Sequence, residues 1–313
     1  MEKYRKPKIE FYRRRTFSEK MNATFDFIRE NWKPLLKYTF YLIMPVCLVQ
    51  TFAMNSFISG YIELLSSAGG GGTLFSANST LVHYGVLMLC SLVGSAIIAG
   101  MVYALMQTYA TRADGLAHIT LDDFKENLVR NIWKILFISL FLIFILSAII
   151  LAATFLAVVV STISLFITIP LIFLCLLLLL PLMMIVPVFI FERDIRFSDA
   201  VKKAWRLGMS ALGGMLALIF VLGVISSVIQ TVTMLPWYIT IVFGNLFSLS
   251  AESPVTQSVV FKFAVYILGL IQTYGMYVSS TIGTIGLAFH YFHVREKVEG
   301  VSIDSNISNF SNL

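Results

Sequence analysis

The residues best placed for chemistry in this chain lie on one predicted helical face near its C-terminal end. Polar and small residues recur there three and four positions apart: Gln272, Gly275, Ser279, Gly283, Gly286 and His290. Small residues let helix backbones approach closely, and Gln or Ser can hydrogen-bond to a neighbouring helix, so one interpretation is helix packing. The other is an intramembrane polar face, on which Gln272, Ser279 and His290 line a site for a lipid or a small solute.

Two other apolar stretches carry similar small-residue faces. In each, small residues recur every four positions: Ser91, Ser95 and Ala99 in one, and Gly223, Ser227 and Thr231 in the other. Packing and a lined cavity are again the two alternatives.

No recognisable catalytic or metal-binding motif is present. The chain contains no GxSxG, HExxH or GxxxxGK[ST] pattern, which are signatures of serine hydrolases, zinc peptidases and phosphate-binding loops. Its histidines form no ligand cluster along the sequence. We therefore predict no catalytic residue, no metal site and no cofactor, and we expect a protein that is not an enzyme. A lipid-acting enzyme without a known motif is the less favoured alternative.

Seven basic residues form a second predicted site. They flank apolar segments in two parts of the chain: Arg13, Arg14, Arg15, Lys20, Lys202, Lys203 and Arg206. Basic residues beside a membrane attract anionic lipid headgroups, so we predict contact with anionic lipids or with a membrane or cytoplasmic protein partner. The net charge of +6 does not indicate a nucleic-acid partner, because 11 of the 23 Lys and Arg residues lie in the first 37 positions.

Three apolar blocks must position these residues. Residues 38–111 carry one charge, residues 135–191 carry none, and residues 207–294 carry two. A helix crosses a bilayer in about 20 residues, so each block is long enough for two crossings. The basic residues lie between the blocks and at both ends, which predicts six transmembrane helices with both termini in the cytoplasm.

The predicted crossings are residues 38–58, 82–109, two within 135–191, 212–232 and 259–292. Within 135–191 we expect a tight turn near residues 161–164 and kinks at Pro170, Pro181 and Pro187. Pro236-Trp237-Tyr238 is typical of an aromatic stop at the membrane interface. Residues 239–250 are apolar but too short to cross alone, so they form either a short external helix or a re-entrant segment.

A threefold repeat organises these crossings. Glu19, Asp123 and Asp199 occupy equivalent positions before the three span pairs, and an acid three residues after a threonine, as in Thr16…Glu19, is a helix-start signal. Amphipathic segments follow, which we interpret as interfacial helices with bends at Pro34 and at Gly213-Gly214. The alternative is that each segment simply continues the next crossing.

The predicted organisation is an all-α polytopic membrane protein with one membrane domain, residues 1–313. Residues 1–37 form a basic cytoplasmic arm and interfacial helix, and residues 294–313 form a cytoplasmic tail. The three units of interfacial helix plus transmembrane hairpin cover approximately residues 16–110, 119–192 and 196–293.

Residues 286–300, which read GLAFHYFHVREKVEG, end the last predicted crossing with aromatic and charged residues and then Glu-Gly. This ending, with residues 17–45 and 197–214, resembles uncharacterised six-span bacterial membrane proteins, of Bacteroidetes type, related to the membrane domain of glycerophosphodiester phosphodiesterases. Hydrolysis in those enzymes belongs to a separate soluble barrel domain, which we do not find in these residues. The resemblance implies a bacterial inner-membrane location and a role near lipids or envelope assembly.

Two functions follow from the sequence. The first is a non-enzymatic inner-membrane scaffold or accessory subunit, whose basic arm and interfacial helices form a cytoplasmic docking face. The alternative is a lipid or small-solute carrier that uses the polar face of the sixth crossing.

Overall fold

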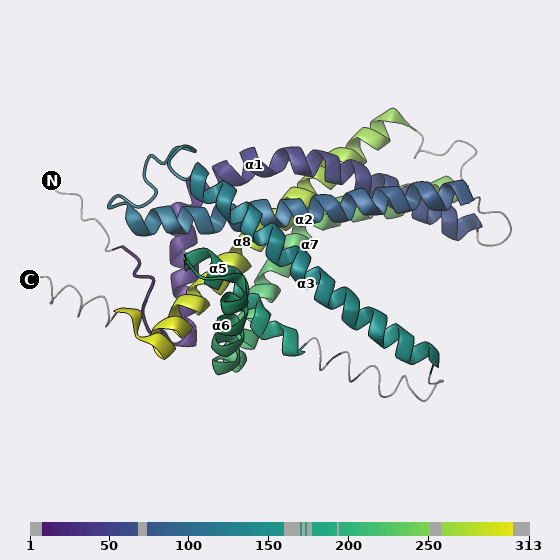
Figure 1. The fold of residues 1–313 in the computed structure, drawn as a ribbon. Coiled ribbons are helices and arrows are strands. Elements are labelled where there is room, and N and C mark those ends of the chain that lie inside the picture. The colour runs from purple at the N-terminus through teal and green to yellow at the C-terminus, as the bar shows by residue number, and fades with distance from the viewer. Residues whose placement is uncertain are drawn as a thin grey trace, which may run out of the picture. The chain divides into compact units, whose positions relative to one another are not determined.

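The computed structural model describes residues 8–67, 74–159, 170, 173, 177–192, 194–250 and 258–302. Every regular element in these ranges is a helix, which confirms the predicted all-α class (Figure 1). The long helices are α1 (Phe17–Ser67), α2 (Leu74–Thr111), α3 (Lys125–Val159), α7 (Leu212–Ser250) and α8 (Val259–Glu299). The short ones are η2 (Leu180–Met184), α5 (Ile185–Phe191) and α6 (Phe197–Ser210).

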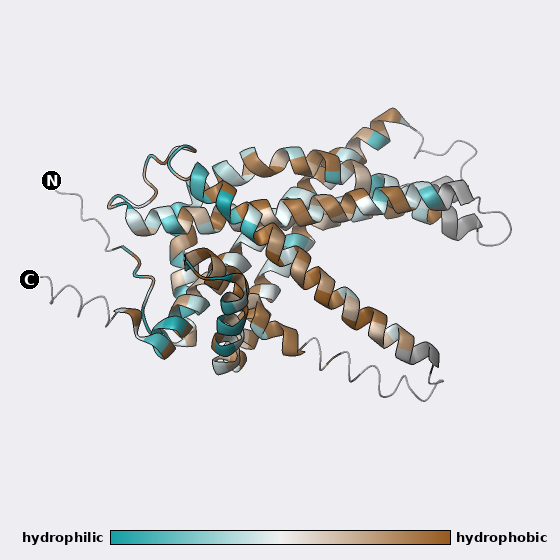
Figure 2. Ribbon diagram, viewed as in Figure 1, coloured by the Kyte–Doolittle hydropathy of each residue, from teal (hydrophilic) through white to brown (hydrophobic). Residues whose placement is uncertain are grey.

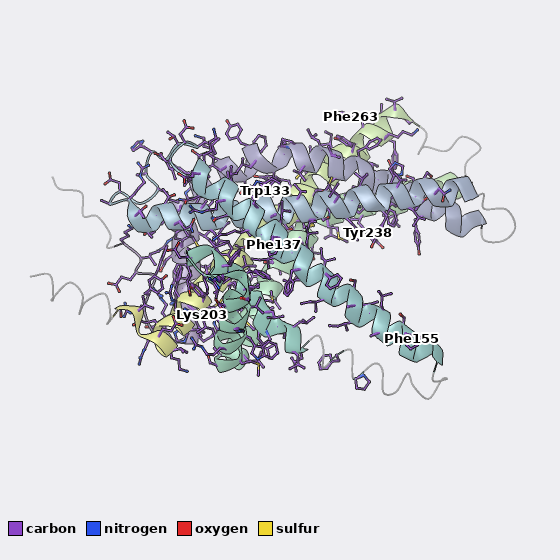
Figure 3. All side chains as sticks on the ribbon, in the orientation of Figure 1. Trp133, Phe137, Phe155, Lys203, Tyr238 and Phe263 are labelled. Carbon is purple, nitrogen blue, oxygen red and sulfur yellow. The ribbon has the colours of Figure 1, made fainter. Side chains whose placement is uncertain are left out.

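Five of these helices, α1, α2, α3, α7 and α8, are long and apolar enough to cross a membrane. The protein is therefore an integral membrane protein with several crossings. Figure 2 shows α3 as apolar along most of its length, and its aromatic side chains Trp133, Phe137 and Phe155 are exposed, as lipid-facing residues would be (Figure 3).

The fourth predicted crossing is described only in part. Its last residues form an apolar helix over Leu177–Phe191, which is shorter than a full crossing. At Pro181, one of the three predicted kinks, the backbone takes the tighter 3₁₀ form of η2 before α5 begins. The kink itself stays a prediction. The turn predicted near residues 161–164 lies outside the described residues.

The chain divides into two compact units. Unit one contains Met1–Asn31, Val102–Val221 and Thr284–Leu313, and unit two contains Trp32–Met101 and Leu222–Gly283. Helices α1, α2, α7 and α8 each contribute residues to both units.

Unit two is held together by close approaches at small residues. Gly94 on α2 lies against the Tyr277 side chain of α8, and Gly60 on α1 lies against Thr80 of α2. A Cβ atom built at Gly60 would lie 2.5 Å from the Thr80 hydroxyl oxygen. Glycine at these positions therefore sets how closely the helices approach.

Unit one has an aromatic core. The Phe11 ring stacks on Phe292 at a centroid distance of 4.9 Å, and Phe27 meets Tyr109 edge-on at 5.2 Å. All four side chains are buried. Burial of large aromatic rings contributes strongly to core stability, so part of the predicted basic arm, around Phe11, is packed against the end of α8.

Helix breaks occur close to two of the predicted bends. In α1 the break is at Asn31, whose φ and ψ are −115° and 20°, and the proline ring of Pro34 disfavours a regular helix in the preceding turn. In the third predicted unit α6 ends at Ser210, and Ala211 separates it from the start of α7 at Leu212. The first and third predicted units thus contain a helical segment before the long helix.

The second repeat departs from the prediction of a separate interfacial helix. Its amphipathic segment is the first part of α3, which runs without interruption over Lys125–Val159. Those residues include no proline or glycine, so nothing in the sequence disrupts the helical hydrogen bonds. Here the alternative interpretation, in which the segment continues the next crossing, is correct.

The predicted stop at Pro236-Trp237-Tyr238 is wrong. Helix α7 continues through Pro236 to Ser250, and it includes residues 239–250. Trp237 is buried, and its indole N–H donates to Asn55 Oδ1 at 3.0 Å. Prolines are tolerated inside membrane helices because neighbouring groups satisfy the freed backbone.

Candidate functional site

Two residues of the predicted polar face of α8 pack against α7 within unit two. A Cβ atom built at Gly275 would lie 2.5 Å from the Thr233 hydroxyl oxygen. Gln230 Nε2 donates to Ser279 Oγ at 3.0 Å, and the Ser226 hydroxyl donates to the Ser279 carbonyl at 3.2 Å. At these positions the face serves helix packing.

The other predicted site residues of α8 belong to different units. Gln272 is half-buried, and its side-chain oxygen accepts a hydrogen bond from the adjacent Thr273 at 3.3 Å. His290 lies later on the same helix and belongs to unit one, whereas Gln272 and Ser279 belong to unit two. A common site of Gln272, Ser279 and His290 stays a prediction.

The small-residue face predicted on α7 is not the face that meets α8. Ser227 and Thr231 are exposed, and a Cβ atom built at Gly223 would have no atom within 4 Å. The residues that contact α8 are Ser226, Gln230 and Thr233. One residue along a helix turns the side chain by about 100°, and spacing alone does not select between adjacent faces.

Polar contacts between the helices of unit two were not predicted. They are the hydrogen bonds Tyr277–Gln50 at 2.5 Å, Gln50–Ser91 at 3.1 Å, Thr51–Thr273 at 3.2 Å and Trp237–Asn55 at 3.0 Å. Gln50 and Asn55 lie within the first predicted crossing. Amide side chains in an apolar segment often hydrogen-bond to a neighbouring helix, so these two residues could have been identified from the sequence.

Unit two also contains a cavity of about 680 Å³. Its lining comes from α1, α2, α7 and α8: Phe52, Asn55, Ser56, Ile58, Ser59, Gly60, Ile62, Ser79, His83, Ile241, Phe261, Lys262, Val265 and Tyr266. About half of these side chains are apolar, and the others offer hydroxyl, amide, imidazole and ammonium groups. Its residues on α8 precede the predicted polar face, which begins at Gln272.

Several polar groups of this cavity already have partners. His83 Nδ1 lies 2.8 Å from the Ser79 carbonyl oxygen, and the Tyr266 hydroxyl donates to the Leu48 carbonyl at 3.1 Å. The Lys262 side chain is exposed and forms no ion pair with the described residues. Lys262 therefore supplies the one ammonium group of the lining.

The predicted basic contacts near the N-terminus separate into two groups. Arg13 and Arg14 are exposed, as a headgroup or partner contact requires. Arg15 and Lys20 are buried, which contradicts their predicted exposure. The Arg15 guanidinium donates to the carbonyl oxygens of Phe11 and Glu10, and burial lowers its pKa.

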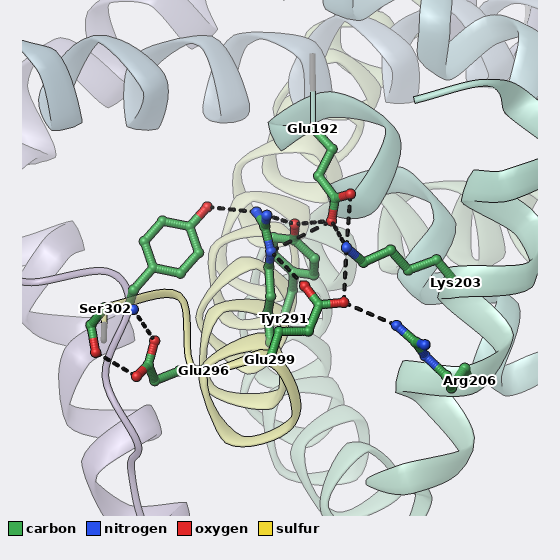
Figure 4. Close-up of polar contacts among 9 residues, drawn as sticks. Glu192, Lys203, Arg206, Tyr291, Glu296, Glu299 and Ser302 are labelled. Atoms are coloured by element: carbon green, nitrogen blue, oxygen red, sulfur yellow. Dashed lines mark hydrogen bonds and ion pairs between the residues drawn. The ribbon is translucent and has the colours of Figure 1, made fainter. Parts of the chain in front are cut away.

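The predicted basic residues of α6 also differ from one another. Lys202 is exposed, whereas Lys203 pairs with Glu192 at 2.9 Å and Glu299 at 2.8 Å (Figure 4). Arg206 pairs with Glu299 at 3.0 Å. Lys203 is thus part of an internal ion-pair network of unit one.

This network extends to the N-terminal segment through Arg295. The Arg295 guanidinium contacts Glu299 at 3.1 Å and donates to the hydroxyl of Tyr12 at 3.1 Å. Burial raises the pKa of Tyr12, although the nearby Arg295 opposes the rise. Tyr291 donates to Glu192 at 3.0 Å. The positive and negative charges of the network nearly balance, and each carboxylate has a cationic partner. The network is therefore best explained as a set of ion pairs that stabilises the packing of unit one.

Within the described residues, no group of three or more His, Cys, Asp or Glu side chains could hold a metal ion. Comparison with protein-family models, curated proteins and solved structures finds no match to this chain. The resemblance to membrane domains of glycerophosphodiester phosphodiesterases therefore stays a prediction.

Proposed function

We propose that this membrane protein binds an amphipathic molecule, most simply a membrane lipid, in the cavity of unit two. The supporting observation is the mixed lining of that cavity. Its volume of about 680 Å³ falls within the range of small-molecule sites, which is roughly 300–1,000 Å³. A lipid or small-solute carrier was the alternative function predicted from the sequence. Its binding site is now proposed in the cavity instead of on the polar face of α8.

The lining offers matching chemistry for both parts of a lipid. Phe52, Ile58 and Val265 provide apolar surface for an acyl chain. Lys262 provides a cationic group for an anionic headgroup, and its long aliphatic stem allows the ammonium to reach water. An anionic lipid is thus the preferred ligand class.

Native mass spectrometry of the full-length protein, extracted with its surrounding lipid, tests the proposal. Ser56→Phe adds a ring within the cavity, whereas Ser227→Phe makes the same change on the exposed face of α7. We expect wild type and Ser227→Phe to retain lipid at a fixed ratio, and Ser56→Phe to lose it. Equal retention by both variants, or no retained lipid in wild type, would contradict the proposal.

We also propose six crossings with both termini in the cytoplasm of a bacterium. The charge pattern and the apolar helix over Leu177–Phe191 support a sixth crossing in addition to the five long helices. Reporter fusions that show on which side of the membrane each terminus lies test the number of crossings. Six crossings place both termini on one side, whereas five place them on opposite sides.

The scaffold role predicted from the sequence is a second candidate. It is supported by the surface of α6, where Trp205 and Met209 are exposed beside Lys202 and Arg206. Aromatic residues, methionine and arginine are enriched at protein interfaces, which fits Trp205, Met209 and Arg206. Crosslinking in native membranes should yield a defined adduct that Trp205→Ala abolishes and Trp133→Ala, on the exposed face of α3, leaves intact. An adduct unaffected by Trp205→Ala would rule out this surface.

A further inference from the structure

Lys20 is a buried cation without a carboxylate partner. Its side chain is 4% exposed, and its Nζ lies 3.3 Å from Nδ1 of His290, which is 270 positions away in the sequence. Among the described residues no acidic side chain forms an ion pair with it. Burying a charge costs free energy unless the charge is paired. A bound anion would supply the missing pair for the Lys20 ammonium.

His290 has a hydrogen-bonding group that no described residue uses. The side chain is fully buried, and its Nε2 has no hydrogen-bond partner. An ammonium can only donate, so Nδ1 is the acceptor from Lys20 and Nε2 of the neutral ring carries the hydrogen. Lys20 and His290 therefore both present donors that need an acceptor.

The surroundings are cationic. Arg15 is also buried, its guanidinium lies over the Phe289 ring at 5.4 Å, and its backbone N–H donates to His293 Nδ1 at 2.9 Å. The rings of His290 and His293 are 6.4 Å apart. Lys297 acts on Lys20 as a further like charge. Arg15 has the carboxylates of Glu10 and Glu19 nearby, so the charge that is left uncompensated in this region is the ammonium of Lys20.

Gly214 lies beside both side chains. A Cβ atom built there would lie 3.5 Å from His290 Cε1 and 3.6 Å from Lys20 Nζ. The neighbouring Gly213 is exposed and has no atom within 4 Å of a built Cβ. The start of α7 therefore carries no side chain at two successive positions, and the second of them faces Lys20 and His290.

A structural role alone accounts less well for these observations. A hydrogen bond between Lys20 and His290 would join two helices, but it would leave the ammonium charge uncompensated and His290 Nε2 unused. The internal network around Glu192 shows the contrast, because even its half-buried cations, Lys203 and Arg295, have carboxylate partners.

We propose that Lys20, His290 and the backbone at Gly214 form a binding site for a phosphate-type oxyanion. Its source is either the headgroup of an anionic lipid or free inorganic phosphate. An oxyanion accepts hydrogen bonds from both side chains and supplies the missing negative charge. All of the residues belong to unit one, so the site is separate from the cavity of unit two.

Calorimetric titration of the full-length protein in a neutral detergent tests the site. The probes are sodium phosphate, short-chain phosphatidic acid, and short-chain diacylglycerol as the control without phosphate. We expect wild type to bind at least one phosphate-bearing probe and Lys20→Met to weaken that binding at least tenfold. Lys202→Met, which removes an exposed charge, should leave it unchanged.

Two further variants separate the possible outcomes. Gly214→Ala fills the space with one methyl group at ordinary contact distances and should weaken binding several-fold without unfolding the protein. Lys262→Met, in the unit-two cavity, should leave it intact, so failure of one proposal does not imply failure of the other. Binding of phosphate alone identifies a free oxyanion site, and binding of phosphatidic acid alone identifies a headgroup site. No binding by wild type, or equal binding by Lys20→Met and Lys202→Met, would overturn the proposal.

Discussion

The Tyr277 hydroxyl donates a 2.5 Å hydrogen bond to Gln50 Oε1 and thereby joins α8 to α1 in unit two. Gln50 in turn donates to Ser91 on α2 at 3.1 Å. Three helices from distant parts of the sequence thus share one polar contact.

Tyr277→Phe should therefore destabilise the protein by about 1 kcal/mol, the usual net value of a buried hydrogen bond. The measurement is the free energy of unfolding in mixed detergent micelles. Tyr238→Phe, on an exposed part of α7, is the control and should change it by less than about 0.5 kcal/mol. Equal effects of the two variants would show that the hydroxyl contact does not stabilise the packing.

Gly208 and Gly213 should respond oppositely to alanine. A Cβ atom at Gly208 would lie 2.6 Å from both Cα and the carbonyl oxygen of Pro181, and backbone cannot move aside as a flexible side chain can. Gly208→Ala should cost about 1–3 kcal/mol through overpacking of α6 against η2. Gly213→Ala meets open space and should be neutral or stabilising by up to about 1 kcal/mol. Melting temperatures of the two variants check this, and a stable Gly208→Ala would contradict the close approach.

The ion pairs around Glu192 should contribute more than an exposed pair. Glu192 and Lys203 are 13% and 18% exposed in their side chains, whereas Asp26 and Arg29 are 53% and 72% exposed. A double-mutant cycle with Glu192→Gln and Lys203→Met should give a coupling of about 1–3 kcal/mol. The cycle with Asp26→Asn and Arg29→Met should give less than about 1 kcal/mol. Similar couplings would mean that solvent screens both pairs equally.

Acid should remove the contribution of Asp123. Its carboxylate accepts hydrogen bonds from the Thr120 backbone and hydroxyl, which hold its pKa below the ordinary value. An unfolded aspartate has a pKa of about 3.9, so the stabilisation is fully present above that value and is lost as pH falls through the lower folded pKa. The melting-temperature difference between wild type and Asp123→Asn should stay constant down to about pH 5 and shrink below about pH 4.

Asp122→Asn is the matched control for this titration. Asp122 is exposed and adjacent in the sequence, but its carboxylate makes no hydrogen bond with the described residues. Its melting-temperature difference from wild type should be close to zero throughout. A pH-independent difference for Asp123→Asn would show that the Thr120 contacts do not depend on the charge of Asp123.

Local chemistry made part of the structure predictable. The Thr16 and Glu19 spacing predicted a helix start, and each side chain bonds the backbone N–H of the other. Pro34 predicted a break within one turn of its observed position at Asn31. These features depend on a few neighbouring residues, because capping and proline geometry are short-range effects.

Predictions failed where the outcome depended on a distant partner. Lys20 and Arg15 were expected at the membrane surface because they are charged, but they pack against the end of α8. Spacing on α7 favoured Gly223 and Ser227, whereas α8 meets Ser226 and Gln230. In lipid all faces of a helix can be apolar, so periodicity carries little information about which face meets another helix.

The sequence by itself determined that the chain is helical, apolar enough to enter a membrane and basic at its N-terminal end, because composition and charge pattern set those properties directly. Only the tertiary structure decided that Tyr277 meets Gln50 and that Lys20 meets His290. These pairs are 227 and 270 positions apart, and their contact depends on how whole helices rotate and approach. That choice follows from the joint packing of many side chains, which no single segment of the sequence specifies.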